Sequence, residues 1–247
     1  MEQLAANIRK AMESKTDASI QQLFDDKIVF ILDHHACDES MKSDDEHFFH
    51  INPHCEGING VNEIAGAGVV YYFSLGMDQQ NRNLAHLGVL GAIGDTQERD
   101  GFKELNNHIL QHAILQKKIS VGKRLKLHGI NSRPLLKVLE YSTDLDIPGV
   151  TNNPDGVKDL LSELRIRYTF RNGKLKKYYH LHPEQKNMLT KKIIELKGDD
   201  NLDIIVPAYT FTEESRRELQ DLRECATIIN ACGRLEEYDT AIAALRG

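Results

Sequence analysis

The chain has 247 residues, of which 40% are hydrophobic and 28% charged, and its formal net charge is −6. These values are ordinary for a globular protein, and the length allows one large domain or two modest ones. No stretch approaches the roughly 20 apolar residues of a membrane-spanning helix, and the first residues lack the pattern of a signal peptide. The four cysteines form no C-x-x-C pair. We therefore expect a cytoplasmic protein with no membrane partner, no zinc ribbon and no disulfide framework.

The charge is unevenly distributed along the chain. Residues 1–100 hold 7 Lys/Arg against 17 Asp/Glu, residues 101–200 hold 19 against 11, and residues 201–247 hold 5 against 9. An acidic first part followed by a basic middle indicates a carboxylate-rich site next to a surface that faces an anion. A basic helix surface that only faces solvent is the other interpretation, and the counts do not separate the two.

The first part of the chain alternates strand-like and helix-like segments. Residues 28–32 form a continuous apolar run that predicts a strand buried on both faces, as in a parallel sheet. Small residues predict a closely packed helix over 65–73, and the small, apolar run 84–93 leads into Gly94-Asp95. This alternation indicates an α/β domain with a parallel sheet. Helices at 2–14 and 103–118 and a polar loop at 36–47 complete the predicted elements of this part.

The second half of the chain is more basic and has more turn signals. Residues 119–185 contain four prolines and the turn dipeptide Asn172-Gly173. Segments 157–164 and 184–197 have the apolar spacing of helices. Residues 203–207 predict a strand that stops at its proline, and residues 212–230 predict a long helix.

Two short polar motifs follow the apolar segments. Asp33-His34-His35 comes directly after the first predicted strand, and ligands bind outside such strand ends in parallel sheets. Asp and His side chains suit metals such as Mn²⁺. Because neighbouring residues of a strand point to opposite sides, we expect one histidine to ligate a metal and the other to face substrate phosphate or support a ligand. Asp95 is the second carboxylate, and such groups can bracket a metal pair for attack on a phosphodiester.

The order of several motifs carries a family resemblance. Asp33-His34-His35 is followed by Asn52-Pro53, then by Ala65-Gly66-Ala67-Gly68, and then by Gly91-Ala92-Ile93-Gly94-Asp95. Each motif alone is weak, because adjacent histidines and loop aspartates are common. Together they resemble the DHH phosphoesterase superfamily, which is named for the triplet and has a Gly-Asp metal motif after a small, apolar helix.

Three further stretches make the resemblance more specific. They are Glu63–Gly68, Arg133–Lys137 with Glu140-Tyr141-Ser142, and Asn230-Ala231-Cys232-Gly233-Arg234. With them, the chain resembles the archaeal RecJ-like nucleases over roughly residues 16–247. The resemblance implies an α/β fold with a parallel-sheet DHH domain at 1–118, incomplete at its N-terminus because the family's His-x-Asp-x-Asp motif is not found. A basic inserted region at 119–187 and a smaller, partial α/β DHH-associated C-terminal domain at 188–247 would follow.

The resemblance also assigns roles to individual residues. It implies that Asp33, His34, His35 and Asp95 are catalytic. Metal ligands would be His34 and Asp95, with Asp17 as a third candidate that could equally cap a helix. Arg234 would contact nucleic-acid phosphate, although a structural salt bridge is its alternative role. Asn230 and Gly233 belong to the same nucleic-acid-binding motif, whereas His54 and Cys37 are expected to be loop residues without a ligand role.

The expected activity follows from these roles. The resemblance implies a Mn²⁺-dependent exonuclease, with Mg²⁺ as a possible substitute, that hydrolyses single-stranded DNA or RNA by metal-activated water. Bases would stack on Tyr168, Phe170, Tyr178 or Tyr179, unless these rings only pack in the core. The alternative is a catalytically weak or inactive scaffold subunit of the archaeal replication machinery that binds the GINS complex and single-stranded nucleic acid. A phosphoesterase for short oligonucleotides is a third, minor alternative.

Overall fold

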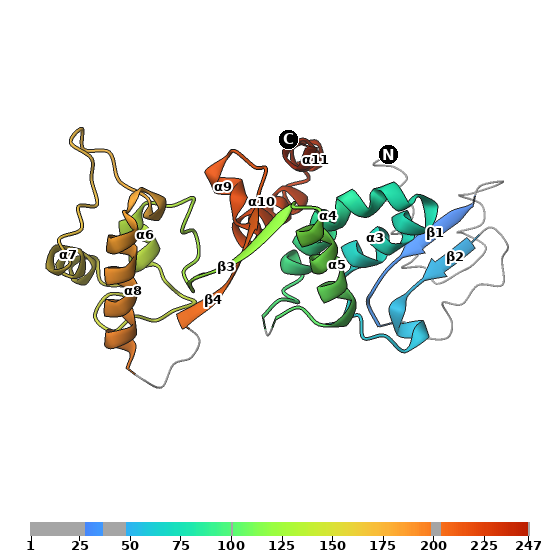
Figure 1. Cartoon of the computed structure of the whole chain (residues 1–247), viewed down its shortest axis with the longest axis horizontal. Helices are drawn as coiled ribbons and strands as arrows, with labels where there is room; N and C mark the ends of the chain where they lie inside the picture. Colours follow the sequence, from blue (N-terminus) through green and yellow to red (C-terminus); the bar gives the residue numbers. More distant parts are fainter. Residues whose placement is uncertain (1–27, 37–47, 100, 199–203, 247) are drawn as a thin grey trace.

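The computed structural model describes residues 28–36, 48–99, 101–198 and 204–246. The predicted helix at 2–14 and Asp17 lie outside these residues, as does nearly all of the predicted loop at 36–47. The molecule is elongated, with strands β1 and β2 at one end, helices α6–α8 at the other, and a long β3–β4 ribbon between them (Figure 1). None of the described helices has the length and apolar character needed to cross a membrane.

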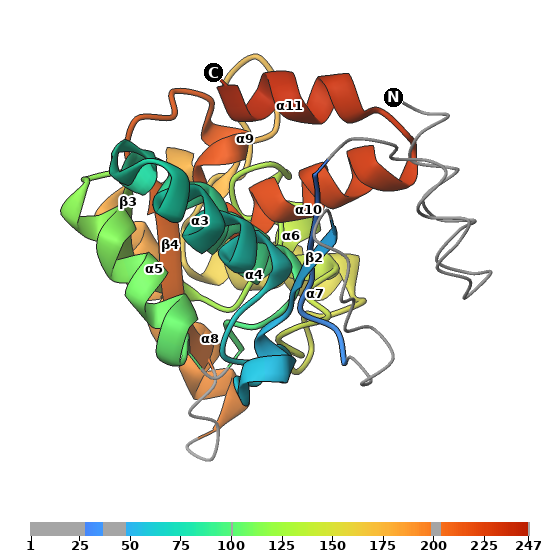
Figure 2. The same cartoon turned by 90° about the vertical axis from the view of Figure 1, so that its right-hand side faces the viewer.

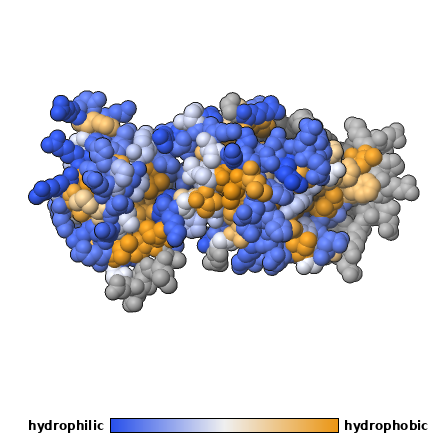
Figure 3. Space-filling view, viewed as in Figure 1, coloured by the Kyte–Doolittle hydropathy of each residue, from blue (hydrophilic) through white to orange (hydrophobic). Residues whose placement is uncertain are grey.

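The mixed α/β fold predicted from the sequence is confirmed, but its parallel sheet is small. Strands β1 (Val29–Leu32) and β2 (Phe48–Ile51) pair in parallel. The Phe30 ring lies 5.1 Å from that of Phe49 and 4.9 Å from that of Phe73 on α3. The prediction that the first strand is buried on both faces is wrong for the described residues, because Phe30 is 45% exposed and each strand of this pair has an open edge. Hydrophobic side chains accordingly reach the surface at this end of the molecule (Figure 3).

Three helices follow the sheet and pack on one another. The predicted helices at 65–73 and 103–118 are confirmed, and the apolar run 84–93 is also a helix. The small residues allow close contact: a Cβ added at Gly91 would lie only 2.2 Å from the Cβ of Ala67. The helices are α3 (Gly66–Met77), α4 (Ala85–Gly94) and α5 (Glu104–Leu115), with 3₁₀ turns η2 (Pro53–Glu56) and η3 (Gln79–Leu84) before and between them.

An antiparallel ribbon forms the middle of the molecule. Strand β3 (Ile119–Leu125) was not predicted, and it pairs along its whole length with β4 (Ile205–Phe211). The prediction that the strand at 203–207 stops at its proline is wrong, because β4 continues past Pro207 to Phe211. The Pro207 carbonyl accepts a hydrogen bond from Nη1 of Arg223 at 3.0 Å, so the polar edge of this residue faces away from β3. Proline has no backbone N–H, but at this position the N–H would point away from β3, so its absence removes no hydrogen bond between β3 and β4.

The described residues of the range 126–204, called the second region here, form a compact body at one end of the ribbon. Their core is built from aliphatic side chains, among them Leu139, Leu161 and Ile193, which are fully buried. The predicted helices at 157–164 and 184–197 are confirmed, and the predicted domain boundary between residues 187 and 188 falls inside the second of them. The helices are α6 (Leu135–Glu140), α7 (Pro154–Glu163) and α8 (Pro183–Lys197), with the 3₁₀ turn η4 (Tyr178–His180).

The C-terminal helices return to the other end of the ribbon. The predicted helix at 212–230 is wrong in its first half, because Asp221 is extended and its side chain caps a new helix by accepting from the N–H groups of Arg223 and Glu224. Helix α10 then packs on α4, and Figure 2 shows α10 and α11 along one side of α3 and α4. The helices are α9 (Arg217–Gln220), α10 (Leu222–Arg234) and α11 (Tyr238–Arg246).

Residues 28–118 and 212–246, called the first region here, share a second core. It includes Ile109 of α5, Val89 of α4 and Cys225 of α10. Glu224 links the two regions: this residue is 3% exposed, and its carboxylate accepts hydrogen bonds of 2.9 Å from the N–H groups of Asn131 and Ser132. Because an unpaired buried carboxylate is costly, these bonds hold the two regions in one arrangement.

Candidate active site

The Asp33-His34-His35 triplet forms a tight turn at the end of β1. The Asp33 N–H donates to the carbonyl of Ile51 at 3.2 Å and so extends the pairing of β1 with β2. Oδ1 of Asp33 accepts from the N–H groups of His34 (2.7 Å) and His35 (3.3 Å) and lies 2.8 Å from Nδ1 of His35. The turn allows both imidazoles to stay on the same side of the chain, with ring centroids 4.6 Å apart.

Asn52 holds this turn from the neighbouring strand. Its Nδ2 donates to the carbonyl of His35 at 2.9 Å, and its Oδ1 accepts from the N–H of His54 at 3.0 Å. The side chain is buried and also caps the 3₁₀ turn that follows β2. The Asn52-Pro53 motif therefore has a structural function that the sequence did not reveal, which is to fix the backbone after the triplet.

His34 points toward Asp95 with a defined nitrogen. Its Nδ1 lies 2.7 Å from the carbonyl oxygen of Gly60, which only accepts hydrogen bonds, so Nδ1 carries the proton. Nε2 is the ring nitrogen that faces Asp95, and it lies 3.6 Å from Oδ2 of that residue. The backbones of Gly60 and His34 approach each other so closely that position 60 requires glycine, because a Cβ there would lie 2.0 Å from the His34 carbonyl oxygen. A histidine with one nitrogen bound to a carbonyl and the other free is the usual metal-ligating form.

Two buried amides, which the sequence did not suggest as site residues, set the position of Asp95. Nε2 of Gln97 donates to the carbonyl of Gly60 (2.9 Å) and to Oδ2 of Asp95 (2.8 Å). Its Oε1 accepts from Asn106 at 2.6 Å, and Asn106 in turn accepts from the N–H of Ala65 at 3.3 Å. Gln97 is 7% and Asn106 1% exposed. Gln97 thus connects the supports of His34 and Asp95, and its position two residues after Gly94-Asp95 is the only signal in the sequence.

The end of α4 presents the Asp95 side chain to solvent. Asp95 is the C-cap of this helix and its side chain is 42% exposed. Asn230 of α10 donates from Nδ2 to the Gly94 carbonyl at 3.1 Å, so one predicted nucleic-acid-binding residue supports the helix end beside Asp95. Gly233 and Arg234 lie one turn later on α10 and are exposed, and Arg234 makes no salt bridge with any described residue.

The hydrogen bonds within the triplet shift two pKa values in opposite directions. Partial burial on its own would raise the pKa of Asp33, but the hydrogen bonds from the His35 ring and from the two backbone N–H groups lower it below its usual value. The hydrogen bond to Asp33, and the negative charge of that group, raise the pKa of His35. The triplet therefore favours an ionised Asp33 beside a protonated His35.

The donor set fits a divalent metal. Candidate ligand atoms of Asp33, His34 and His35 lie within 4.8 Å of one another, and Asp95 faces Nε2 of His34. Imidazole nitrogen with carboxylate oxygen suits Mn²⁺ and, less specifically, Mg²⁺. Of the predicted metal ligands, the structure thus brings His34 and Asp95 together, while Asp17 lies outside the described residues. Nε2 of His54 is buried beside Gly60 without a hydrogen-bond partner among the described residues.

Comparison with known proteins places a family domain in the second region. Residues 127–203 match the family model of the DHH-CID domain; they are 77 of the 247 residues and lie outside the His34–Asp95 site. No curated protein matches the chain significantly. The matched range coincides with the core of the second region, which ends at Ile204. The match shows that residues 127–203 are similar to the DHH-CID domain, over less than half of the chain.

Proposed function

We propose that this protein is a metal-dependent phosphodiesterase of the archaeal RecJ-like type that hydrolyses single-stranded DNA or RNA. The observation that carries the proposal is the pairing of His34 Nε2 with Asp95 Oδ2 at 3.6 Å, each side chain being held by a partly buried hydrogen bond. Groups that are fixed before a ligand arrives lose little freedom when they bind it. Such preorganisation is the expected design of a metal centre rather than of an incidental surface cluster.

The residues of the site divide the work between metal and substrate. His34 and Asp95 would hold Mn²⁺ or Mg²⁺, which supplies a Lewis acid for the phosphate and lowers the pKa of water. Asp33 keeps the His35 ring in place through the 2.8 Å contact. A protonated His35 is exposed and can contact a negatively charged phosphate oxygen. Arg234 on α10 would contact the strand further along.

The direct test is hydrolysis of labelled single-stranded DNA and RNA by the purified chain with Mn²⁺. We expect cleavage by the wild type and its loss in the His34→Ala plus Asp95→Asn double variant. Mn²⁺ binding, followed by paramagnetic resonance, should fall in parallel because both proposed ligands are gone. A matched control is His108→Ala plus Asp239→Asn, since these exposed residues lie on α5 and α11 and away from the triplet.

The two readouts separate the outcomes. Equal cleavage by the double variant and the control would refute the assignment of His34 and Asp95. Folded wild-type protein that binds Mn²⁺ but cleaves neither DNA nor RNA would refute the proposed nuclease activity but not the proposed metal centre. Cleavage of short oligonucleotides alone would show a small-substrate phosphoesterase.

A scaffold subunit of the replication machinery is the second candidate function. It is favoured by the geometry of Asp33, whose Oδ1 already accepts hydrogen bonds from three groups of its own turn and is therefore engaged in shaping the chain. In this case the protein would bind the GINS complex and single-stranded nucleic acid with little hydrolysis. Co-migration with purified GINS in gel filtration, unchanged in the His34→Ala plus Asp95→Asn variant, is the expected result for a scaffold.

A further inference from the structure

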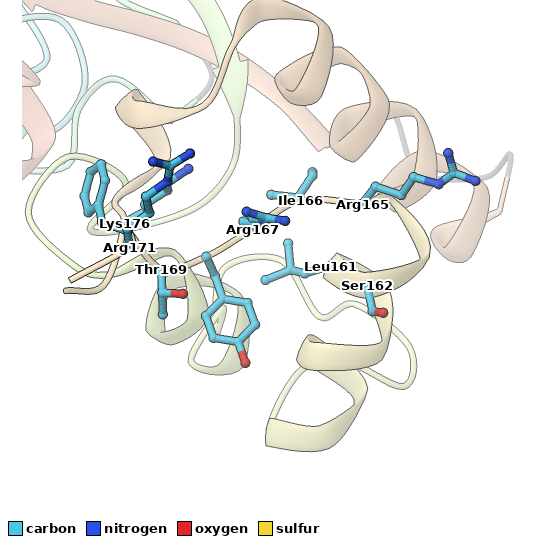
Figure 4. Close-up of a pocket in the computed structure, with 10 residues that line it drawn as sticks. Leu161, Ser162, Arg165, Ile166, Arg167, Thr169, Arg171 and Lys176 are labelled. Carbon is cyan, nitrogen blue, oxygen red and sulfur yellow. The ribbon is translucent and has the colours of Figure 1, made fainter. Parts of the chain in front are cut away.

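A pocket of about 770 Å³ opens in the second region, away from the His34–Asp95 site. It lies between the end of α7 and the segment that follows this helix (Figure 4). Its lining combines cations with aromatic rings and a few apolar groups. The residues that matter for its chemistry are Arg165, Arg167, Arg171, Lys176, Tyr168 and Phe170.

The cations of this pocket are not neutralised by neighbouring acids. Residues 164–183 contain six Lys/Arg and no Asp or Glu. Arg165, Arg167 and Arg171 form no salt bridge within the part of the chain that the structure describes. The preceding acid, Glu163, is already paired with Lys192 at 2.9 Å. Like charges gathered without counter-charges repel one another, and an anionic ligand removes that repulsion.

The backbone fixes the spacing of these cations. A short hairpin, closed by hydrogen bonds from Phe170 N–H to the Lys174 carbonyl (2.8 Å) and from Lys176 N–H to the Tyr168 carbonyl (2.7 Å), carries the segment. Ile166 is 3% exposed and anchors the segment in the core, so the arginines on either side of it cannot slip inward. Arg165 lies in the turn that follows α7, with a φ of 52°, and Arg171 lies in the turn of the hairpin, so the local backbone holds each of them in a defined place.

The arginines follow one another along the segment after α7. Figure 4 shows Arg165, Arg167 and Arg171 in succession along the segment, with Lys176 beside Arg171. Each planar guanidinium can bind a phosphate with two parallel hydrogen bonds. Phe170 belongs to the same pocket and is 37% exposed, and the Lys176 ammonium lies 5.4 Å from its ring centroid. A partly exposed ring among these cations gives a base a surface on which to stack.

We infer that this pocket is a binding subsite for single-stranded nucleic acid, with phosphates at Arg165, Arg167 and Arg171 and a base against Phe170. The inference rests on the proposed function for its substrate class and adds a second place of contact at the opposite end of the molecule from β1 and β2. A peptide of acidic residues alone would satisfy the arginines, but it has no aromatic ring to stack on Phe170. Nucleic acid is therefore the ligand class that uses every feature of the pocket.

The test is fluorescence anisotropy of labelled oligothymidylate with the full chain in EDTA, titrated at several salt concentrations. In Arg167→Gln plus Arg171→Gln, the slope of log affinity against log salt should fall by about 1.4, because each lost single-strand phosphate contact removes about 0.7. The matched control, Lys158→Gln plus Lys191→Gln, removes the same charge from α7 and α8 outside the pocket and should keep the wild-type slope. Phe170→Ala should weaken binding about 5- to 150-fold without changing the slope.

Each outcome supports or overturns the subsite. Equal slopes for the pocket variant and its control would overturn it. Displacement of the oligonucleotide by polyglutamate, together with unchanged binding in Phe170→Ala, would show a general acidic-polymer surface instead. Oligothymidylate binding that persists in the Asp95→Asn variant would show that the pocket binds the strand independently of the proposed metal site. If wild-type binding depends on the pocket while Mn²⁺ supports no cleavage, only the proposed nuclease activity fails.

Discussion

The two regions of the molecule hold their functional side chains in opposite ways. In the first region, His34, Gln97 and Asn106 are largely buried, and their hydrogen bonds form one connected network. In the second region, Arg165 and Arg167 are exposed and make no ion pair with any described residue. A metal needs ligand atoms fixed within a fraction of an ångström, whereas a nucleic-acid strand is attracted by charge that acts over several ångströms. The difference in burial thus corresponds to the difference in ligand.

The strongest test of this contrast removes one core side chain from each region. Ile109→Ala and Leu139→Ala should each lower the free energy of unfolding by about 2–5 kcal/mol, because both side chains are fully buried. Only Ile109→Ala should also weaken Mn²⁺ binding by the folded protein, since Ile109 packs against the positions of Gly68 and Gly88 on α3 and α4. Urea unfolding and Mn²⁺ titration measure the two effects. Equal losses of Mn²⁺ affinity would show that the regions do not act separately.

The close packing of α3 on α4 gives the second test. Gly91→Ala should destabilise the protein by about 1–3 kcal/mol, because the new methyl group would lie 2.2 Å from the Cβ of Ala67. Gly76→Ala, on the open side of α3, should stabilise it by up to about 1 kcal/mol, since alanine favours a helix and nothing lies within 4 Å. Thermal unfolding followed by circular dichroism compares the pair. A shift of the same sign in both variants would contradict this account of the packing.

Gln97 provides the third test, because it supports ligands without being one. Gln97→Leu should lower Mn²⁺ affinity about 10- to 100-fold, the usual effect of losing a group that orients metal ligands. The loss follows because Asp95 and the Gly60 carbonyl both lose their hydrogen bond from Nε2. Calorimetric titration with Mn²⁺ gives the affinity. Gln116→Leu, at the exposed end of α5, serves as the control and should bind like the wild type.

The smallest expected effect concerns Cys225 and tests whether α10 belongs to the first region. Burial raises the pKa of the Cys225 thiol to about 11, from 9.0 when exposed. A raised folded pKa contributes stability below the unfolded value, and this contribution is lost as the pH rises from about 9 toward about 11. The unfolding free energy should therefore fall more steeply with pH in the wild type than in Cys225→Ala. Parallel profiles would mean that the thiol is not buried in the core that α10 shares with α4.

The sequence predicted those parts of the fold that depend on local patterns. The helices at 103–118 and 184–197 have apolar residues at helical spacing, and the structure has them. Strand β3 has only Ile119 and Leu125 buried at its two ends, and the intervening residues through Arg124 are polar, small or exposed. Its extended conformation comes from pairing with β4, which is about 86 residues away in the chain, and local propensity does not reveal such a partner.

The candidate site shows the same limit. The motifs predicted that His34 and Asp95 belong together, and the structure places them 3.6 Å apart. The supporting residues Gln97 and Asn106 were not found, because amide side chains are common on surfaces and only their burial identifies them. Asn230 was predicted to bind nucleic acid, and its observed hydrogen bond is to the Gly94 carbonyl. Its predicted contact with a strand stays a prediction.

The β3–β4 ribbon has a consequence for how such a chain can change during evolution. The two described connections between the regions are the strands of this ribbon. They end side by side in the second region, where the Lys126 N–H donates to the Ile204 carbonyl at 2.9 Å. A segment whose two ends are adjacent can be exchanged as a cassette, provided that the replacement supplies N–H donors to Glu224 in place of those of Asn131 and Ser132. The metal ligands would keep their support through such an exchange, since the network around Gln97 uses no residue of the cassette. Substrate choice and chemistry can then diverge at different rates within one polypeptide.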